Sequence, residues 1–357
     1  MNDVLNSIKP AVRALRAYTL SPHRASVKIN QNENPWDAPA RIKEEILRRF
    51  AARKWSRYPD FVPVSLNEHL AEFAGWKPDG IIAGNGSNEL IQALLMVTVA
   101  AGKTVVISEP TFALYRQIAT VLGGAVESVP LTHGLQYDGE ALLKRVEAVQ
   151  PDVTIICSPN NPTGCVIDDG ALKTLLRTSR GLVVIDEAYH EFAEHSVVSL
   201  LREHENLIVL RTFSKAMAFA GLRIGYSLAS PELTREIRKA VLPYNLNALS
   251  QIAAEVAVEN YEDELRPLVK QIIAERERVF EELSQIKDFC PVASKGNFMV
   301  VKSGATDPAR IFADLLTRDI LIRDVSAYPM LTDYFRFSIG TPEENNKLLK
   351  AIREIGD

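Results

Sequence analysis

The chain has 357 residues, 46% of them hydrophobic and 24% charged, with a formal net charge of -4, which predicts an ordinary soluble globular protein of two domains. No Lys/Arg run, no apolar run of membrane-spanning length and no secretory leader is visible, so we expect neither a nucleic-acid nor a membrane partner. Three widely spaced cysteines, Cys157, Cys165 and Cys290, suit neither a disulfide framework nor a metal site and favour a reducing cytoplasm.

The first segment, residues 1–38, has little periodicity and reads as an arm that contains Tyr18 and the turn-forming string Asn30-Gln-Asn-Glu-Asn-Pro35. A helix is predicted at about 39–51. One face of this helix collects Ile42, Ile46, Leu47 and Phe50. The loop Arg57-Tyr-Pro-Asp60 follows, and by itself a Tyr before Pro is typical of a half-buried loop anchor.

From Ile81 onward, apolar runs alternate with amphipathic segments, which predicts an α/β domain with a mainly parallel sheet between helices. Strands are expected at 81–83, 104–108, 126–129, 153–157, 182–185, 207–210 and 224–228. Helices are expected at about 88–99, 113–122, 139–149, 168–178 and 231–240, and a long periodic segment at about 250–286.

The last third of the chain reads as a smaller α+β domain. Its apolar runs lie at 298–301, 320–322 and 335–339, and a helix is expected after Pro342. We therefore expect a large domain at 39–245 and a small domain that combines 1–38 with 246–357.

Polar residues follow several of the predicted strands, at the sheet edge where open α/β proteins bind ligands. Gly84-Asn-Gly-Ser-Asn-Glu89 joins a strand to a helix, so backbone N–H groups converge there and favour phosphate, although the string also suits a generic turn. Phe112, after the next strand, offers an aromatic face or simply packs on its own helix.

Two further strand ends carry polar strings, Ser158-Pro-Asn-Asn-Pro-Thr-Gly164 and Asp186-Glu-Ala-Tyr189. The first could be only a loop. An acid such as Asp186 at the end of a buried strand needs a cationic partner or loses its charge. Magnesium is one such partner, but the chain lacks the Gly-Lys-Ser/Thr phosphate motif that usually accompanies it.

Thr212-Phe-Ser-Lys215 follows another buried strand, and Arg223 lies eight residues beyond the lysine. An amine with a nearby hydroxyl and guanidinium suits a cofactor that carries an aldehyde and a phosphate, because Lys215 can condense with the aldehyde while Ser214 and Arg223 hold the dianion. The simpler alternative is a solvated lysine in a polar turn. Near the end of the chain, Arg323 and Arg336 lie within apolar runs, where an arginine needs a structural carboxylate or an anionic substrate.

Together these segments resemble the pyridoxal-phosphate (PLP) dependent aminotransferases of the aspartate aminotransferase fold (PLP fold type I), in particular the histidinol-phosphate aminotransferases. The likeness runs from Asn32 to Thr341 in the family's order. It implies that Lys215 holds PLP and transfers the proton, that Asp186 pairs with the ring nitrogen, and that Asn161 and Tyr189 contact the phenolic oxygen.

The resemblance also implies the remaining contacts and a homodimer with shared sites. Its other cofactor residues are Gly86, Ser87, Asn88, Phe112, Thr212, Ser214, Arg223 and, from the partner, Tyr58. Its substrate residues are Tyr18, Asn34, Arg323 and Arg336. The chain departs from the family at Asn88, where an acid is usual, and at Phe112, where Tyr is common.

The resemblance implies transamination between histidinol phosphate and 2-oxoglutarate in histidine biosynthesis. The alternatives are an aromatic amino acid aminotransferase and a phosphothreonine decarboxylase of the same family. A PLP-fold transcription regulator would need a DNA-binding module, and no helix-turn-helix pattern is visible in residues 1–38. An inactive binding protein is disfavoured because Lys215 and Asp186 are both present.

Overall fold

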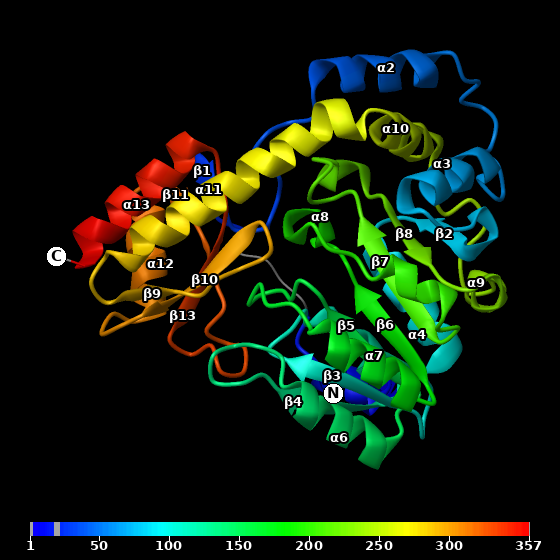
Figure 1. Ribbon diagram of the computed structural model, residues 1–357, viewed down its shortest axis with the longest axis horizontal. Coiled ribbons are helices and arrows are strands. Elements are labelled where there is room, and N and C mark those ends of the chain that lie inside the picture. Colours follow the sequence, from blue (N-terminus) through cyan, green and yellow to red (C-terminus); the bar gives the residue numbers. More distant parts are fainter. Residues whose placement is uncertain (1–2, 18–21, 357) are drawn as a thin grey trace.

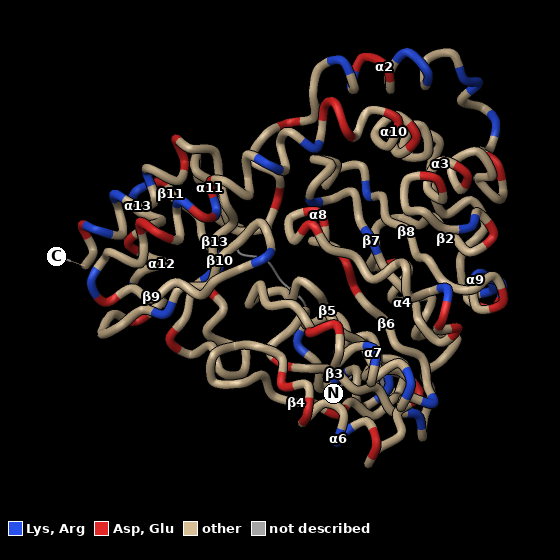
Figure 2. Tube along the Cα trace, viewed as in Figure 1, with Lys and Arg blue, Asp and Glu red and all other residues tan. Residues whose placement is uncertain are grey.

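The computed structural model describes residues 3–17 and 22–356, which form a seven-stranded sheet, a four-stranded sheet and a two-stranded sheet, with helices packed around the two larger ones. Helix α11 (Arg266–Ser284) runs from the region of the large sheet to that of the small one (Figure 1). Charged residues of both signs are intermixed, mostly along the outer helices (Figure 2). Among the described residues, no helix combines the length and the apolar character needed to cross a membrane.

The large sheet has seven strands. They are β2 (Ile81–Gly84), β3 (Thr104–Glu109), β4 (Ala125–Pro130), β5 (Val153–Cys157), β6 (Leu182–Asp186), β7 (Leu207–Thr212) and β8 (Gly225–Leu228). Their order is β2-β8-β7-β6-β5-β3-β4, and β8 runs opposite to the other six strands. The predicted α/β class with a mainly parallel sheet is thereby confirmed, with small shifts at the strand ends.

Both faces of this sheet are buried, which explains the continuous apolar runs. On β6, for example, Val183 and Ile185 pack into one hydrophobic core and Val184 into the other, because successive side chains of a strand point to opposite faces. The two cores lie between the sheet and the helices that cover it. The sheet is therefore a rigid platform for the residues that follow its strands.

The helices around the large sheet include most of those predicted. They are α2 (Ala40–Ala51), α3 (Val64–Ala74), α4 (Ser87–Thr98), α5 (Leu114–Leu122), α6 (Gly139–Val149), α7 (Asp169–Thr178), α8 (His190–Ala193), α9 (Pro231–Arg238) and α10 (Ala248–Glu259). Short 3-10 turns lie at η1 (Asp3–Ser7), η2 (Pro78–Gly80), η3 (Val198–Arg202) and η4 (Ala220–Leu222), and α1 (Pro10–Ala14) lies in the arm.

Two expectations about these helices need correction. Helix α3 was not predicted, although Leu66 and Leu70 are spaced for one helix face and both are buried. On α2, Leu47 does not share the buried face: its side chain is 60% exposed while Ile42 and Ile46 are buried. Positions five apart lie about 140° around a helix, which turns Leu47 away from Ile42.

The small sheet has the order β12-β13-β10-β9 and is antiparallel. Its strands are β9 (Phe289–Pro291), β10 (Phe298–Ser303), β12 (Arg323–Asp324) and β13 (Tyr334–Ser338). Helices α11, α12 (Pro308–Thr317) and α13 (Pro342–Gly356) pack with it around one core. The arm joins this part of the chain because its strand β1 (Val27–Lys28) pairs in parallel with β11 (Ile320–Leu321).

The periodic segment expected at about 250–286 is interrupted. Helix α10 ends at Glu259, a π-helical turn covers Tyr261–Leu265, and α11 begins at Arg266. The break precedes Pro267, which lacks a backbone N–H and whose ring would clash with the preceding turn of a continuous helix. This break separates the helix beside the large sheet from the helix that reaches the small one.

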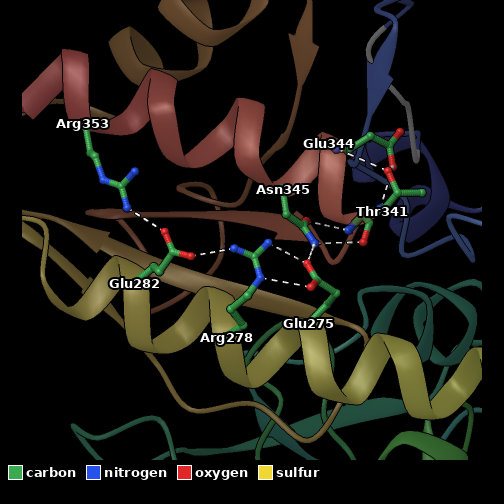
Figure 3. A network of polar contacts seen from close by, with 8 residues as sticks. Glu275, Arg278, Glu282, Thr341, Glu344, Asn345 and Arg353 are labelled. Carbon is green, nitrogen blue, oxygen red and sulfur yellow. Dashed lines mark hydrogen bonds and ion pairs between the residues drawn. The ribbon is translucent and has the colours of Figure 1, made fainter.

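A polar network ties α11 to α13 (Figure 3). Arg278 donates to Glu275 (2.7 Å) and to Glu282 (2.6 Å), and Arg353 of α13 also donates to Glu282 (2.7 Å). Asn345, at the start of α13, donates to Glu275 (2.9 Å). Because the charges form one connected set, they fix the relative position of the two helices better than isolated surface pairs would.

Candidate active site

A cavity of about 450 Å³ lies at the carboxyl ends of β5, β6 and β7, beside the start of α4 and the strands β12 and β13. The ends of neighbouring parallel strands meet at one edge of a sheet, so side chains far apart in the sequence converge there. The predicted site residues that line this cavity are Ser87, Asn88, Phe112, Asn161, Asp186, Tyr189, Thr212, Ser214, Lys215, Arg223, Arg323 and Arg336.

The turn from β2 into α4 forms a cradle for an anion. Gly86 has a φ of +82°, and Ser87 begins α4, whose first N–H groups have no partners within the helix. A Cβ at position 86 would lie 2.5 Å from Nη2 of Arg223, so glycine lets the guanidinium lie against the turn. Backbone N–H groups, the helix dipole and this cation together suit a phosphate.

The hydroxyl groups of the lysine loop complete the cradle. Nη1 of Arg223 donates to Oγ of Ser214 (3.0 Å), and the N–H of Ser214 donates to Oγ1 of Thr212 (3.2 Å). Arg223 has a φ of +52°, which is uncommon for a residue other than glycine and occurs often at functional sites. The predicted phosphate-binding groups thus lie together around one end of the cavity.

Lys215 lies in the cavity with its amine next to the arm. Its Nζ donates to the backbone oxygen of Gln31 (2.9 Å). Burial, and to a smaller extent the positive charge of Arg336, lowers the pKa of Lys215 to about 7. A substantial fraction of this amine is therefore neutral near pH 7, which is the form that attacks an aldehyde.

Asp186 ends β6 and is almost fully buried. Burial raises the pKa of its carboxyl to about 6, while hydrogen bonds from Tyr115 (2.6 Å to Oδ2) and from the N–H of Ala188 (3.1 Å to Oδ1) act in the opposite direction. A cation placed beside this acid would stabilise its charged form. Among the described residues, no group of three or more His, Cys, Asp and Glu could hold a metal ion.

The hydroxyl of Tyr189 is the centre of a polar cluster at the other side of the cavity. It accepts from Nδ2 of Asn161 (3.3 Å) and from Nδ2 of Asn32 (3.0 Å). Nη1 of Arg336 donates to Oδ1 of Asn161 (2.6 Å). These contacts hold a hydroxyl, an amide and a guanidinium side by side, where they can bind an oxygen atom and an anion of a ligand.

Two arginines lie on adjacent strands of the small sheet. Arg323 of β12 and Arg336 of β13 are directly opposite each other in the antiparallel register, and both line the cavity. Nη2 of Arg336 also donates to the backbone oxygen of Asn30 (2.9 Å), which fixes the guanidinium against the arm. The pair gives this wall of the cavity a positive potential that attracts anionic substrates.

Three of the predicted residues that the structure describes do not line the cavity. Gly86 is not a lining residue but lies against Arg223, which is one. Asn34 lies beyond it, because its side chain donates to the backbone oxygen of Ala216 (3.1 Å) and accepts from the N–H of Trp36 (3.0 Å). Tyr58 is 77% exposed, and its ring stacks on that of Tyr244 with the ring centroids 4.5 Å apart. Tyr18 lies outside the described residues.

Sequence reasoning missed several residues of the site, and two of them make side-chain contacts with predicted site residues. Asn32 contacts Tyr189, whereas Asn34 was expected to face the substrate; the left-handed φ of +54° at Asn32 turns the segment between them. Tyr115 contacts Asp186 across 71 residues of sequence. Tyr115 lies three residues after Phe112, at the start of a helix beside the cavity, and this spacing could have indicated that it belongs to the site.

The chain matches the family model described as aminotransferase class I and II over residues 25–352. With the fold and the site above, this match shows that the chain belongs to the class I and II aminotransferase family. It is therefore an aminotransferase, as the sequence predicted.

Relatives within this family are similar over nearly the whole chain. The chain is 37% identical to the histidinol-phosphate aminotransferase of Chlorobium luteolum over 353 residues, 98% of each chain. It is 36% identical to that of Chlorobaculum tepidum over 350 residues, 98% of this chain and all of the relative. The predicted likeness to histidinol-phosphate aminotransferases is confirmed.

Solved structures agree with this result. The histidinol-phosphate aminotransferase from Sinorhizobium meliloti, in complex with pyridoxal 5'-phosphate, has a TM-score of 0.87 at 25% identity and covers 98% of this chain and 97% of its own. That from Clostridium acetobutylicum has a TM-score of 0.86 at 26% identity and covers 92% of this chain and 99% of its own.

Proposed function

We propose that this aminotransferase converts histidinol phosphate and 2-oxoglutarate to imidazole-acetol phosphate and glutamate, a step of histidine biosynthesis. Its cofactor is pyridoxal 5'-phosphate. The observation that carries the substrate proposal is the pair Arg323 and Arg336 in the cavity, beside a separate phosphate cradle at Arg223. The names of the relatives support the same substrate.

The cavity fits the cofactor. The cradle of Gly86, Ser87, Ser214 and Arg223 would hold its phosphate, because glycine at position 86 leaves room for the guanidinium and the helix N-terminus. At the other end, burial makes the charge of the Asp186 carboxylate costly, and a protonated ring nitrogen would supply a balancing cation.

When bound, PLP supplies an aldehyde that condenses with amines and a ring that accepts electrons. Lys215 would hold this group and would move a proton at the substrate carbon, a task suited to an amine whose pKa burial lowers to about 7. Asp186 would hold a proton at the ring nitrogen. Asn161 and Tyr189 would orient the ring by donating to its phenolic oxygen.

In this proposal, Arg336 and Arg323 bind different substrates. Arg336, held by Asn161, grips the carboxylate of 2-oxoglutarate. Arg323 grips the phosphate of histidinol phosphate, since a guanidinium fork matches phosphate geometry. An aromatic amino acid aminotransferase and a phosphothreonine decarboxylase remain the alternatives. The three functions differ in the substrate group that would bind to each of these two arginines.

Arg323→Ala should raise the KM for histidinol phosphate by about 10- to 100-fold, because a charge-assisted contact to phosphate is lost. The KM for 2-oxoglutarate should change by less than about threefold. Steady-state kinetics with each substrate varied in turn makes the comparison. Arg318→Ala, which removes a partly exposed arginine that pairs with Glu354, is the matched control.

Equal losses for both substrates, or no loss for the phosphate ester, would favour the aromatic aminotransferase. Steady-state rates with phenylalanine and phosphothreonine, measured on the same preparation, separate the two alternatives from each other. Turnover of phosphothreonine with release of carbon dioxide would identify the decarboxylase.

We further propose a homodimer in which Tyr58 reaches the phosphate of the partner's cofactor. Tyr58 and Phe61 both pack on Tyr244, yet 77% and 64% of their surfaces are exposed, as expected for aromatic residues that a partner covers. The chain divides in this proposal into a large domain at 39–245 and a small one formed by 1–38 and 246–357. A cytoplasmic location is supported by its free cysteines.

Mixed dimers of Lys215→Ala and Tyr58→Ala chains should recover activity. If Tyr58 acts across the interface, one site collects both defects and the other is wild type. The rate per mixed dimer should then match that of a dimer of wild-type and Lys215→Ala chains, which has one intact site. If the rate per verified mixed dimer does not rise above that of the Tyr58→Ala homodimer, Tyr58 acts within its own chain.

A further inference from the structure

Tyr115 makes a contact that the proposed function does not yet use. It lies in the first turn of α5, its side chain is fully buried, and its hydroxyl donates to Oδ2 of Asp186 at 2.6 Å. Phe112, three residues earlier, lines the cavity and packs edge-on against Tyr115, with ring centroids 5.5 Å apart. One short segment therefore carries both an aromatic wall of the cavity and the side-chain donor to its buried acid.

This donor is the main side-chain support of the Asp186 charge. Burial raises the pKa of Asp186 to about 6, and the two groups that lower it are the hydroxyl of Tyr115 and the N–H of Ala188. The adjacent Glu187 raises it, but the charge of Glu187 is paired with Arg211 at 3.0 Å. A hydrogen bond donated to a carboxylate favours its charged form, and more so in a buried site.

The other titratable groups near Asp186 are engaged elsewhere. The hydroxyl of Tyr137 donates to the backbone oxygen of Cys157 (2.5 Å). The thiol of Cys157 donates to the backbone oxygen of Pro159 (3.3 Å). Tyr189 belongs to the cluster with Asn161. Burial raises the pKa of Tyr115 itself well above 10, so its hydroxyl keeps its proton and remains a donor throughout the working pH range.

We propose that Tyr115 is a positioning residue that holds Asp186 as a carboxylate directed at the cofactor's ring nitrogen, so that the proton they share stays on the nitrogen. The inference rests on the proposed function, because it assumes that the ring lies against Asp186. A shared proton resides on the more basic partner. Without the hydroxyl, the buried acid becomes more basic and competes with the nitrogen for that proton.

The first test uses the cofactor-free protein, so it does not depend on catalysis. Tyr115→Phe removes the hydroxyl and keeps the ring. Infrared difference spectra against Asp186→Asn isolate the carboxyl band, and its titration should move from about 6 to about 7, the size expected for a lost hydrogen bond to a charged group. Tyr226→Phe, which removes another buried hydroxyl bonded to Arg211, should leave the titration unchanged.

The second test reads the ring nitrogen in the loaded enzyme. With ¹⁵N-labelled PLP, the wild-type ring nitrogen should have the chemical shift of a protonated pyridine. In Tyr115→Phe the shift should move towards that of the unprotonated ring in Asp186→Asn, and kcat should fall about tenfold with little change in KM. An unchanged nitrogen shift and an unchanged Asp186 titration would overturn the inference.

A third variant tests the inference if Tyr115→Phe does not fold. Difluorotyrosine at position 115 keeps the shape and donates a stronger hydrogen bond, so it should lower the pKa of Asp186 below about 6; a rise or no change would contradict the proposal. A failure of the proposed function would be recognised by a different result. The wild-type protein would then not bind PLP at Lys215, and this result does not depend on residue 115.

Discussion

Lys215→Ala should lower the rate of transamination by about a thousandfold or more, because both the covalent hold on the cofactor and the proton transfer are lost. The protein should still fold, since the amine contributes one hydrogen bond, to the backbone oxygen of Gln31. A buried amine whose pKa lies well below its usual value is also costly to charge, so its removal should cost little stability.

The measurement is the steady-state rate with histidinol phosphate and 2-oxoglutarate, together with the visible absorbance of the purified protein. Lys173→Ala, which removes an exposed lysine of α7, is the control and should behave as wild type. A Lys215→Ala enzyme that retains a tenth of the wild-type rate would remove this lysine from the mechanism.

Asp186→Asn should lower the rate by about a hundred- to a thousandfold. Asparagine keeps the shape and, with its single oxygen, can still accept one of the two hydrogen bonds that Tyr115 and Ala188 donate, but it has no charge to hold a proton on the ring nitrogen. Asp186→Glu, which retains the charge on a longer side chain, should lose less activity than Asp186→Asn.

Thermal unfolding of Asp186→Asn provides the check on structure, and an unchanged or slightly higher melting temperature is expected because a buried charge is removed. Asp169→Asn, at an exposed carboxylate of α7, is the matched control. Near-normal turnover of Asp186→Asn would show that the acid does not act on the cofactor.

The sequence was informative about the site because its polar strings directly follow buried strands. Asp186 and the loop that begins at Ser158 come immediately after apolar runs, and the strands β5 and β6 are neighbours in the sheet. Parallel strands bring such ends to one edge without any knowledge of packing. The same rule placed Lys215 and Phe112 at the cavity.

Contacts that depend on the turn of a helix or a loop could not be predicted in this way. The contact of Tyr115 with Asp186 depends on how α5 is placed relative to β6. Asn32, rather than Asn34, contacts Tyr189 because the backbone of the arm turns at Asn32, which has a left-handed φ. Helix α3 was missed although its apolar spacing was present. Leu47 was assigned to the wrong face for a different reason: it lies five positions after Ile42, so the helical repeat itself turns it outward.

The central claim is that Lys215 holds pyridoxal phosphate in this cavity. Purified protein loaded with the cofactor and reduced with borohydride should carry a permanent pyridoxyl group, and mass spectrometry of its peptides should locate that group on Lys215. The Lys215→Ala protein, treated in the same way, should carry none. A pyridoxyl group on another lysine of the wild-type protein, or none at all, would contradict the account.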